Sequence, residues 1–366
     1  MIAFLDMKSV YAELKPELDA AYHRVMESGW YVLGKEVEAF EAEYAAFCGT
    51  KHCIGLGNGL EALELVLRGW DIGPGDEVIV PSNTYIATWL AVTAVGATVV
   101  PVEPTPNGPN IDPERLAAAI TPRTKAIMPV HLYGEPADME AIAALARKHG
   151  LKVVEDVAQA QGSKVRGRRA GALGEAGAHS FFPTKNIGAF GDGGAVTTDD
   201  DILADRLRAL RNYGSKVKYV NIERGFNSRL DEMQAAFLRV KLKHLDRWNE
   251  QRRVIAARYD DKLAGIPGLG LPRAPQWAEP VWHLYVVRTD RRAELIKALE
   301  QKGIGTLVHY PIPPHLQQAY ADLGQGKGTY PLAERLADTV LSLPMGPHLK
   351  LEQVDEIAAA VRSTLN

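Results

Sequence analysis

Short apolar strands that alternate with helices are the feature that most restricts the fold of this chain. Between residues 52 and 213 the hydrophobic pattern repeatedly predicts a strand followed by a helix. Short β-branched strands separated by helices are typical of a largely parallel sheet covered on both faces. The predicted strands cover residues 52–56, 77–80, 98–102, 126–130, 151–155, 178–182 and 195–198, and the predicted helices residues 60–68, 85–95, 113–120, 139–149 and 202–213. We therefore expect an α/β fold with a mostly parallel sheet.

Helices dominate both flanks of this region. Apolar residues at helical spacing predict helices at residues 10–28 and 35–47, and long helices over 231–246 and onward to 263. Residues 265–279, rich in Gly and Pro, indicate a boundary. Beyond it the pattern predicts strands at 281–288 and 308–311, and helices at 291–302 and 352–364. The expected organisation is a large unit, residues 1–245, and a smaller C-terminal α+β unit, residues 246–366.

Charge and cysteine content argue against several classes of function. The 366 residues include 42 Lys and Arg against 45 Asp and Glu, which gives no electrostatic case for a nucleic acid or an anionic membrane as partner. The two cysteines, Cys48 and Cys53, lack CxxC spacing and the histidines are not clustered, so we expect neither a disulfide framework nor a metal site. The N-terminus lacks the order of a signal peptide, and no apolar run approaches the ~20 residues that span a bilayer. We expect a soluble, cytoplasmic protein.

Lys185 stands in a loop directly after a predicted strand, in the stretch SFFPTKNIGAFGDGGAV (residues 180–196). Pro183 cannot donate to a sheet ladder and marks the exit of the strand. Catalytic groups concentrate in strand-end loops on a rigid sheet. A lysine in such a loop can lose part of its hydration, so that its pKa falls and it attacks a carbonyl carbon. The simpler interpretation is a solvated surface lysine in a glycine-rich turn.

Asp156 favours the catalytic interpretation. It lies at the end of a buried-type strand in LKVVEDVAQA (residues 151–160). Pyridoxal phosphate requires a lysine that forms a Schiff base and an aspartate on the pyridinium nitrogen, which keeps the ring protonated. An acid at one strand end carries little information by itself. An acid and a lysine at successive strand ends predict a site for this cofactor.

The turn Gly57-Asn58-Gly59 between a strand and a helix predicts an anion site. The free N–H groups and the helix dipole both point at a ligand there. A dinucleotide fingerprint is rejected, because its third glycine is missing and the nearest acids, Asp76 and Glu77, open the next strand. Parallel sheets bind ligands at the carboxyl ends of their strands. Four features fall at such strand exits: the turn at 57–59, Tyr85, Asp156 and Lys185.

Taken together, these stretches resemble the DegT/DnrJ/EryC1/StrS family of sugar aminotransferases, which have the aspartate-aminotransferase (type I) fold. The resemblance runs from SGWYVLG at residues 28–34 to LSLP at residues 341–344. It implies that Lys185 carries pyridoxal 5'-phosphate as a Schiff base, that Asp156 pairs with the pyridine nitrogen, and that Gln159 approaches the ring hydroxyl. Tyr85, in PSNTY (residues 81–85), matches the aromatic residue that stacks on the ring.

The resemblance also implies how the phosphate is held. Ser180 and the turn at Asn58, Gly59 and Leu60 match phosphate contacts of the family. Many members have threonine where this chain has Leu60, so the contact there would involve the backbone alone. Asn227 matches an asparagine that reaches the phosphate from the partner subunit, which implies a homodimer.

The implied activity is amino transfer to a nucleotide-linked keto-sugar. GDGG at residues 191–194, GSKVKY at 214–219 and NSRLDE at 227–232 resemble members that aminate C3 of dTDP-3-keto-6-deoxyhexoses, with L-glutamate as amino donor. The glycines at 191–194 are equally compatible with a hinge. The alternatives are a C4 aminotransferase acting on a 4-keto nucleotide sugar, and a sugar dehydratase or regulatory homologue on the same scaffold. Some relatives are dehydratases with histidine in place of the lysine, so Lys185 favours transamination.

Three residues are candidates for substrate binding. Arg229 has a planar fork that suits a carboxylate or a phosphate, although a structural salt bridge accounts for it equally well. His309 and Tyr310 match family positions near the sugar, and packing is the alternative role for this histidine.

Three aromatic residues have less defined roles. His131, in VHLYG (residues 130–134), is expected to be a structural residue at a strand end near the site. Trp30 and Tyr31 either shape the pocket or pack in the core.

Overall fold

Seven strands form the central sheet. The computed structural model describes residues 1–366, and the strands lie in the order β1-β9-β8-β5-β4-β2-β3. Their bounds are β1 His52–Leu56, β2 Glu77–Pro81, β3 Thr98–Val102, β4 Thr124–Ile127, β5 Lys152–Asp156, β8 Ala176–Ser180 and β9 Gly194–Thr198. Neighbours from β8 to β3 pair in parallel, whereas β9 is antiparallel to both β8 and β1. β1 therefore runs in the same direction as β8, and the expected mostly parallel sheet is confirmed.

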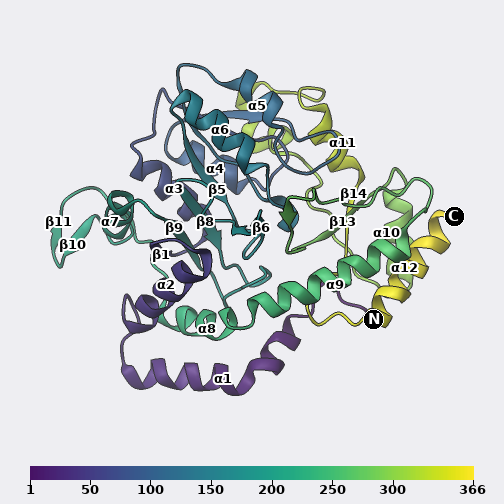
Figure 1. Cartoon of the computed structure of the whole chain (residues 1–366), viewed down its shortest axis with the longest axis horizontal. Helices are drawn as coiled ribbons and strands as arrows, with labels where there is room; N and C mark the ends of the chain where they lie inside the picture. Colours follow the sequence, from purple (N-terminus) through teal and green to yellow (C-terminus); the bar gives the residue numbers. More distant parts are fainter.

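Helices cover both faces of this sheet (Figure 1). They are α2 Lys35–Cys48, α3 Gly59–Gly69, α4 Ala87–Ala94, α5 Pro113–Ala119, α6 Met139–His149, α7 Asp201–Leu210 and α8 Glu232–Leu242. Alternate strand residues point to opposite faces. Val78 and Val80 pack with α3, α4 and α7, whereas Ile79 packs with α5 and α6. On the second face, α2 and α8 cover Cys53 of β1 and Ala195 of β9.

α6 shows why some helix bounds follow directly from the sequence. The side chain of Asp138 accepts the backbone N–H of Ala141 and so caps the first turn. Gly150 ends the helix in the left-handed conformation with φ 66°, which glycine adopts without a Cβ clash. The predicted helix at residues 139–149 is confirmed at both ends. None of the helices in the structure is both long enough and apolar enough to cross a membrane.

The C-terminal part has its own core. It contains α9 Leu245–Leu263, α10 Arg292–Gln301, α11 Pro331–Thr339, α12 Leu351–Leu365 and the antiparallel pair β13 Tyr285–Arg288 and β14 Val340–Leu343. Ile2 from the other end of the chain packs into this core. Its N–H donates to the carbonyl of Gly303 at 2.8 Å, and its carbonyl accepts the N–H of Gly305 at 2.9 Å. The division of the chain after residue 245 stays a prediction.

Two of the expected C-terminal strands differ from the structure. The strand predicted at 308–311 is wrong, because only Leu307 forms a bridge, to Ser342. Prolines follow this segment closely and cannot donate to a ladder. The strand predicted at 281–288 begins only at Tyr285, because Trp282 has a left-handed φ of 46° that interrupts an extended chain.

The remaining elements are short, apart from α1, which covers Met7–Ser28. Small ladders are formed by β6 Lys164–Val165, β7 Arg168–Arg169 and β12 Ala278–Glu279, and 3₁₀ helices by η1 Leu132–Gly134, η2 Pro314–Leu316 and η3 Gln318–Leu323. The hairpin of β10 Ser215–Val217 and β11 Val220–Asn221 projects from the body at the left of Figure 1. Its tip residue Tyr219 is 88% exposed.

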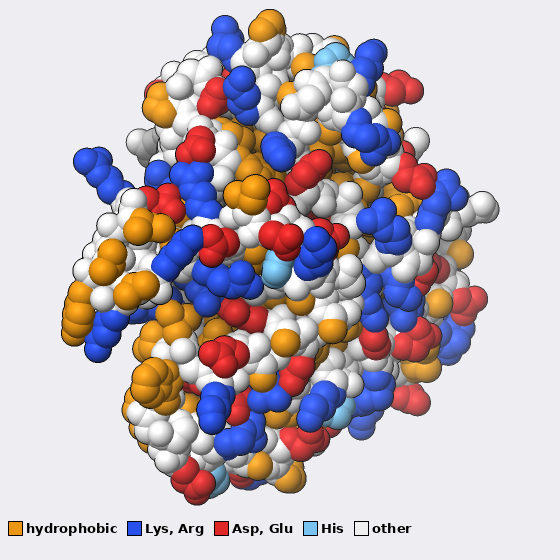
Figure 2. Space-filling view, turned by 60° about the vertical axis from the view of Figure 1, so that its left-hand side comes forward, with side chains coloured by type: hydrophobic (Ala, Val, Ile, Leu, Met, Phe, Trp, Pro, Cys, Tyr) orange, Lys and Arg blue, Asp and Glu red, His pale blue; other side chains and the backbone are white.

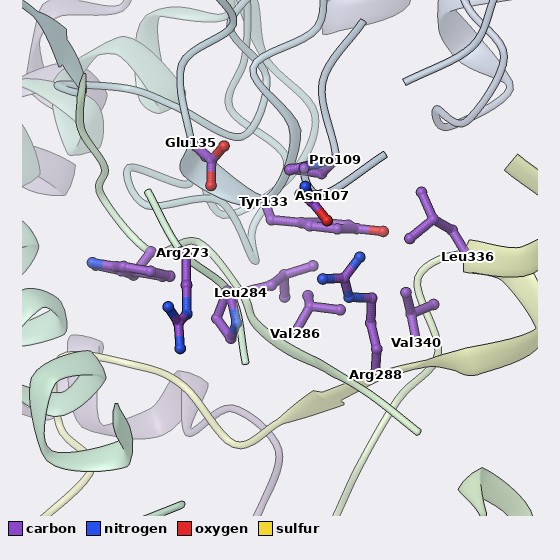
Figure 3. A pocket seen from close by; sticks show the side chains of 13 residues that line it. Asn107, Pro109, Tyr133, Glu135, Arg273, Leu284, Val286, Arg288, Leu336 and Val340 are labelled. Carbon is purple, nitrogen blue, oxygen red and sulfur yellow. The ribbon is translucent and has the colours of Figure 1, made fainter. Parts of the chain in front are cut away.

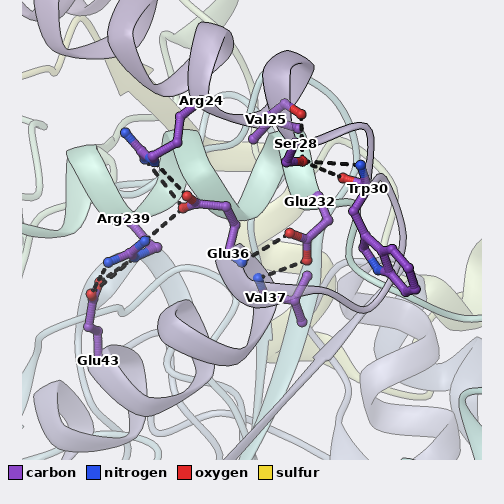
Figure 4. Close-up of polar contacts among 9 residues, drawn as sticks. All are labelled: Arg24, Val25, Ser28, Trp30, Glu36, Val37, Glu43, Glu232 and Arg239. Carbon is purple, nitrogen blue, oxygen red and sulfur yellow. Dashed lines mark hydrogen bonds and ion pairs between the residues drawn. The ribbon is translucent and has the colours of Figure 1, made fainter.

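Glu232, the first residue of α8, fastens the N-terminal helices to the sheet layer (Figure 4). Its carboxylate accepts the backbone N–H groups of Gly34 at 2.7 Å and of Glu36 and Val37 at 3.0 Å. These groups belong to the start of α2, which has no side-chain cap of its own. Arg239 of α8 also donates to Glu36, at 2.7 Å. α8 therefore supplies the cap that α2 lacks.

Replacing Glu232 with Ala should lower the free energy of unfolding by about 2 kcal/mol, because it leaves several N–H groups of a buried helix start without an acceptor. Denaturant titration followed by circular dichroism measures this change. Glu300→Ala, at an exposed position of α10, is the control and should change the same quantity by less than about 0.5 kcal/mol. Equal losses in the two variants would contradict the capping role of Glu232.

Candidate active site

The ends of four strands bring the predicted groups to one edge of the sheet. β1, β2, β5 and β8 run in the same direction, so the residues that follow them lie at the same edge. At these exits lie the turn at 57–59 after β1, Tyr85 after β2, Asp156 at the end of β5, Ser180 at the end of β8, and Lys185 in the loop that follows. The predicted grouping at the strand exits is confirmed.

A tight turn presents Lys185 after β8. Its backbone N–H donates to the carbonyl of Phe182 at 2.9 Å. Gly188 follows so closely that a Cβ there would lie 2.2 Å from the carbonyl oxygen of Pro183. Only glycine fits at this position, since any side chain would push the loop open. The amine of Lys185 has no hydrogen-bond or ion-pair partner in the protein, and the side chain is half-buried.

Asp156 is a buried carboxyl group without a cationic partner within ion-pair distance. Its Oδ1 accepts the N–H of Ala158 at 3.1 Å, and its Oδ2 accepts the hydroxyl of Thr88 at 3.1 Å. Thr84 in turn contacts the Thr88 hydroxyl at 2.9 Å. Burial raises the pKa of Asp156, and these two hydrogen bonds oppose the rise. A carboxyl group held in this way suits a ligand that brings its own positive charge.

Burial lowers the pKa of Lys185 to about 8, and the charge of Asp156 opposes this change. An ordinary lysine has a pKa of about 10.4, so much more of this amine is neutral near physiological pH. The neutral amine is the form that attacks carbonyl carbons. Lys185 therefore does not fit the interpretation as a solvated surface lysine.

The start of α3 forms a cradle next to Ser180. Asn58 caps this helix by accepting the N–H of Glu61 at 2.9 Å. The N–H groups of Gly59 and Leu60 have no acceptor in the protein. A Cβ at Gly59 would lie 2.6 Å from Cβ of Ser180, so the glycine allows helix and strand end to approach. Free amides, the helix dipole and a serine hydroxyl suit a phosphate.

Gln159 connects the sheet edge to the C-terminal part of the chain. Its Oε1 accepts the N–H of Tyr133 at 2.7 Å, and its Nε2 donates to the hydroxyl oxygen of Tyr310 at 2.8 Å. The rings of Tyr310 and the exposed Tyr85 have centroids 5.3 Å apart. Three of the residues expected at the site, Gln159, Tyr310 and Tyr85, therefore lie together.

Tyr133 and Ser342 are site residues that the sequence did not reveal. The hydroxyl of Tyr133 donates to the carbonyl of His309, and Nδ1 of His309 contacts Oγ of Ser342 at 2.8 Å. Burial, and then the charge of Lys185, lowers the pKa of His309 to about 4, so its ring is neutral near physiological pH. Tyr133 could have been predicted as a site residue, because it follows the predicted strand at 126–130 by three positions and strand ends carry the site. Ser342 gave no such signal.

His131 has the structural role that the sequence suggested. Its Nδ1 accepts the N–H of Ala137 at 3.0 Å, so its Nε2 carries the proton and donates to Glu155 at 2.9 Å. Glu155 is fully buried and also accepts backbone N–H groups, including that of Gly171 at 2.9 Å. This buried pair fixes the strand end next to Asp156.

The other expected residues form no hydrogen bond with the site residues described above. Arg229 is half-buried and donates to Oδ1 of Asn212 at 2.9 Å, not to a carboxylate, so the salt bridge considered for it is absent. Asn227 is exposed. Trp30 and Tyr31 are 62% and 50% exposed, so the core role considered for them is wrong. No hydrogen bond or ion pair joins Asn227 or Arg229 to Lys185 within one chain.

Comparisons with known proteins agree on one family. The model of the DegT/DnrJ/EryC1/StrS aminotransferase family matches residues 12–362. The dTDP-3-amino-3,4,6-trideoxy-alpha-D-glucose transaminase of Streptomyces venezuelae is 58% identical over 99% of this chain and 95% of its own. The dTDP-3-amino-3,6-dideoxy-alpha-D-galactopyranose transaminase of Aneurinibacillus thermoaerophilus is 52% identical over 99% of both chains. The crystal structure of S. venezuelae DesV in complex with a ketimine intermediate is 57% identical, with a TM-score of 0.98 over 99% of this chain and 98% of that one.

Acetylation of Lys185 by acetic anhydride in the cofactor-free protein should increase with pH through about 8, because only the neutral amine reacts. Asp156→Asn should move this midpoint to lower pH, since it removes the charge that favours the ammonium form. Mass spectrometry of the Lys185 peptide measures the extent of reaction at each pH. The exposed Lys148 in the same samples is the internal control for the reactivity of the reagent at each pH. A Lys185 midpoint near about pH 10 would contradict the lowered pKa.

Proposed function

The chain belongs to the DegT/DnrJ/EryC1/StrS aminotransferase family, and, as it is a pyridoxal-phosphate-dependent aminotransferase of nucleotide sugars, we propose that it aminates C3 of a dTDP-3-keto-6-deoxyhexose with L-glutamate as amino donor. One observation carries the choice of catalytic centre. A lysine with a lowered pKa and a buried carboxyl group without a cationic partner lie at the same sheet edge.

The residues at this edge fit the cofactor from end to end. Asp156 would pair with the ring nitrogen, since this buried carboxyl has no cation of its own. The free amides of Gly59 and Leu60 and the hydroxyl of Ser180 would hold the phosphate. Tyr85 would lie against the ring, and Gln159, already oriented by Tyr133, would approach the ring hydroxyl.

Lys185 would carry the cofactor covalently and then act as the general acid and base. Pyridoxal phosphate, when bound, supplies a protonated ring that takes up the electrons of a broken C–H bond and keeps the amino group between the two half-reactions. Nζ of Lys185 would take the proton from Cα of the donor and deliver it to C4′ of the cofactor. A pKa of about 8 suits both tasks, because neither form of the amine is strongly disfavoured near physiological pH.

The side chains of the C-terminal part suit the sugar. His309 is neutral near physiological pH, so one ring nitrogen stays available for a sugar hydroxyl while Nδ1 contacts Ser342. Tyr310 lies between Gln159 and Tyr85, and so next to the expected ring position. Arg229 would bind the diphosphate or the donor carboxylate. Its guanidinium lies 5.4 Å from the centre of the Tyr213 ring, and its one hydrogen-bond acceptor, Asn212, leaves most of its donors free.

Amination at C3 rests on the relatives. The two curated transaminases at 58% and 52% identity both carry a 3-amino sugar in their names. The alternative of amination at C4 uses the same residues and differs only in how the sugar is placed. A dehydratase on this scaffold is disfavoured by Lys185.

A homodimer is the remaining part of the proposal. The faces of α1 and α8 carry a groove lined by Tyr11, Leu18, Tyr22, Phe190 and Phe237, and several of these rings are exposed. Apart from this groove, Figure 2 shows exposed apolar side chains on the segment that projects at its left. Phe190 belongs to the loop that carries Lys185, so a second copy seated here would adjoin the site. The exposed Asn227 would then reach the phosphate of the partner's site.

Incubation with L-glutamate and a dTDP-3-keto-6-deoxyhexose should yield a product with nitrogen at C3, as read by NMR. Lys185→Ala should reduce turnover by at least about a thousandfold and remove the absorbance band of the Schiff base between Lys185 and the cofactor. Lys148→Ala, at an exposed position of α6, is the matched control and should behave like the wild type. A product aminated only at C4 from a 4-keto substrate would refute the regiochemistry and leave the enzyme class intact. Full turnover in Lys185→Ala would refute the assignment of the catalytic residue.

Mixing two inactive variants tests the contribution of the partner subunit. Lys185→Ala and Asn227→Ala should each lose activity, and subunit exchange between them should restore about one quarter of the wild-type activity, because half of the dimers are hybrids with one intact site of two. Activity before and after exchange is the measurement. A mixture that stays inactive although hybrids form would mean that Asn227 serves its own subunit.

A further inference from the structure

A cavity lined by Tyr133 lies apart from the side chains described above, since neither Lys185 nor Tyr310 lines it. The space inside it that admits water-sized molecules is ≈ 40 Å³, and the ≈ 510 Å³ of unoccupied space in and around it includes open solvent at its mouth. Residues 107–109 and Tyr133 form one side, and β13, β14, α11 and residues 272–273 form the other. Tyr133 lines this cavity and also a smaller one with His309 and Tyr310. The phenol of Tyr133 thus separates the larger cavity from the site residues described above.

The floor of the cavity is apolar. Leu284, Val286 and Val340 are buried side chains of one cluster, and Tyr133 and Leu336 pack against that cluster. Figure 3 shows these side chains below and beside the Tyr133 ring. A short hydrocarbon group placed here would lose contact with water on most sides, which favours binding.

Glu135 is a buried residue whose carboxyl group has no partner in the chain. It is 8% exposed, and its carboxyl group has no hydrogen-bond or ion-pair partner in the protein. Figure 3 shows the carboxyl group directed into the cavity from the side of η1. Burial raises its pKa to about 8, with Arg288 opposing the rise, so the group is mostly protonated at neutral pH and can donate a hydrogen bond.

Arg288 is the second residue of the cavity whose charged group has no partner in the chain. Its backbone is fixed, because its N–H and carbonyl both bond to Gly270, at 2.9 and 2.8 Å. Its guanidinium has no acceptor in the protein, although the side chain is half-buried. Figure 3 shows this guanidinium below the ring of Tyr133, within the cavity. Arg335, which lines the adjoining hollow, differs in that it is paired with Asp290 at 2.6 Å.

An unpaired guanidinium and an unpaired carboxyl group in one cavity leave strong hydrogen-bonding capacity unused, which costs free energy when water is partly excluded. The balance of charge favours an anion. Arg288 lies within the cavity, and the exposed Arg273 at its edge also has no ion-pair partner in the protein. A planar carboxylate matches the fork of a guanidinium and accepts two parallel hydrogen bonds.

We propose that this cavity is a binding site for a small carboxylate with a short branched or linear hydrocarbon body. The carboxylate lies on Arg288 and accepts a further hydrogen bond from the carboxyl group of Glu135. The hydrocarbon body lies on Leu284, Val286 and Val340. This site is separate from the reacting centre, because the phenol of Tyr133 stands between them and donates to the carbonyl of His309.

Titration calorimetry of the complete holoenzyme with 3-methylbutyrate tests the proposal. The wild type should show saturable binding at one site per chain, and Arg288→Met should weaken it at least about tenfold, because the methionine keeps the bulk and removes the fork. Arg335→Met is the matched control and should bind like the wild type. The neutral analogue 3-methylbutanamide should bind at least about tenfold more weakly, since it lacks the charge.

Glu135→Gln separates this ligand from a cationic one. The amide keeps a hydrogen-bond donor without charge, so 3-methylbutyrate should bind this variant within about threefold of the wild type. A loss of about tenfold or more in Glu135→Gln would overturn the proposal, because it would mean that the ligand needs a negative charge at this position. Absence of saturable binding, or equal binding to Arg288→Met, would also overturn it. Displacement of 3-methylbutyrate by dTDP would place it in the nucleotide-sugar site and refute a separate site.

Discussion

The site depends on a carboxyl group that the fold buries without giving it a cation. Asp156 ends a central strand, where neighbouring strands and α4 remove it from water, and its partners are the N–H of Ala158 and the hydroxyl of Thr88. Burial of an unpaired carboxylate is costly, and the raised pKa of Asp156 reflects this cost. A ligand with a positive charge at the right place offsets it. Under the proposed function, the protonated ring of the cofactor would bring this charge.

Several parts of this arrangement follow from local sequence. The alternation of strands and helices fixes a parallel sheet, and a parallel sheet fixes which strand ends share an edge. Lys185 and Asp156 could therefore be placed at one edge from their positions after predicted strands. The glycines around Asn58 predicted an anion cradle in the same way, because free N–H groups at the start of a helix favour an anion.

Other parts could not be predicted, because they depend on contacts between distant segments. Nothing around Gln159 indicates that Tyr310 bonds to it, since the two are joined only by the packing of the C-terminal part on the sheet. The strand predicted at 308–311 failed for a related reason. Val308 packs against the C-terminal core and Tyr310 bonds to Gln159, and the prolines that follow cannot donate to a ladder. An arginine often forms an ion pair, and only the fold shows that Arg229 donates to the neutral Asn212 instead.

The seating of Ile2 in the C-terminal core has a consequence for folding. Ile2 forms backbone hydrogen bonds with Gly303 and Gly305, and the whole central sheet lies between these partners along the chain. Closing so long a loop costs conformational entropy. We therefore expect the segment before α1 to become ordered only after the C-terminal core has formed.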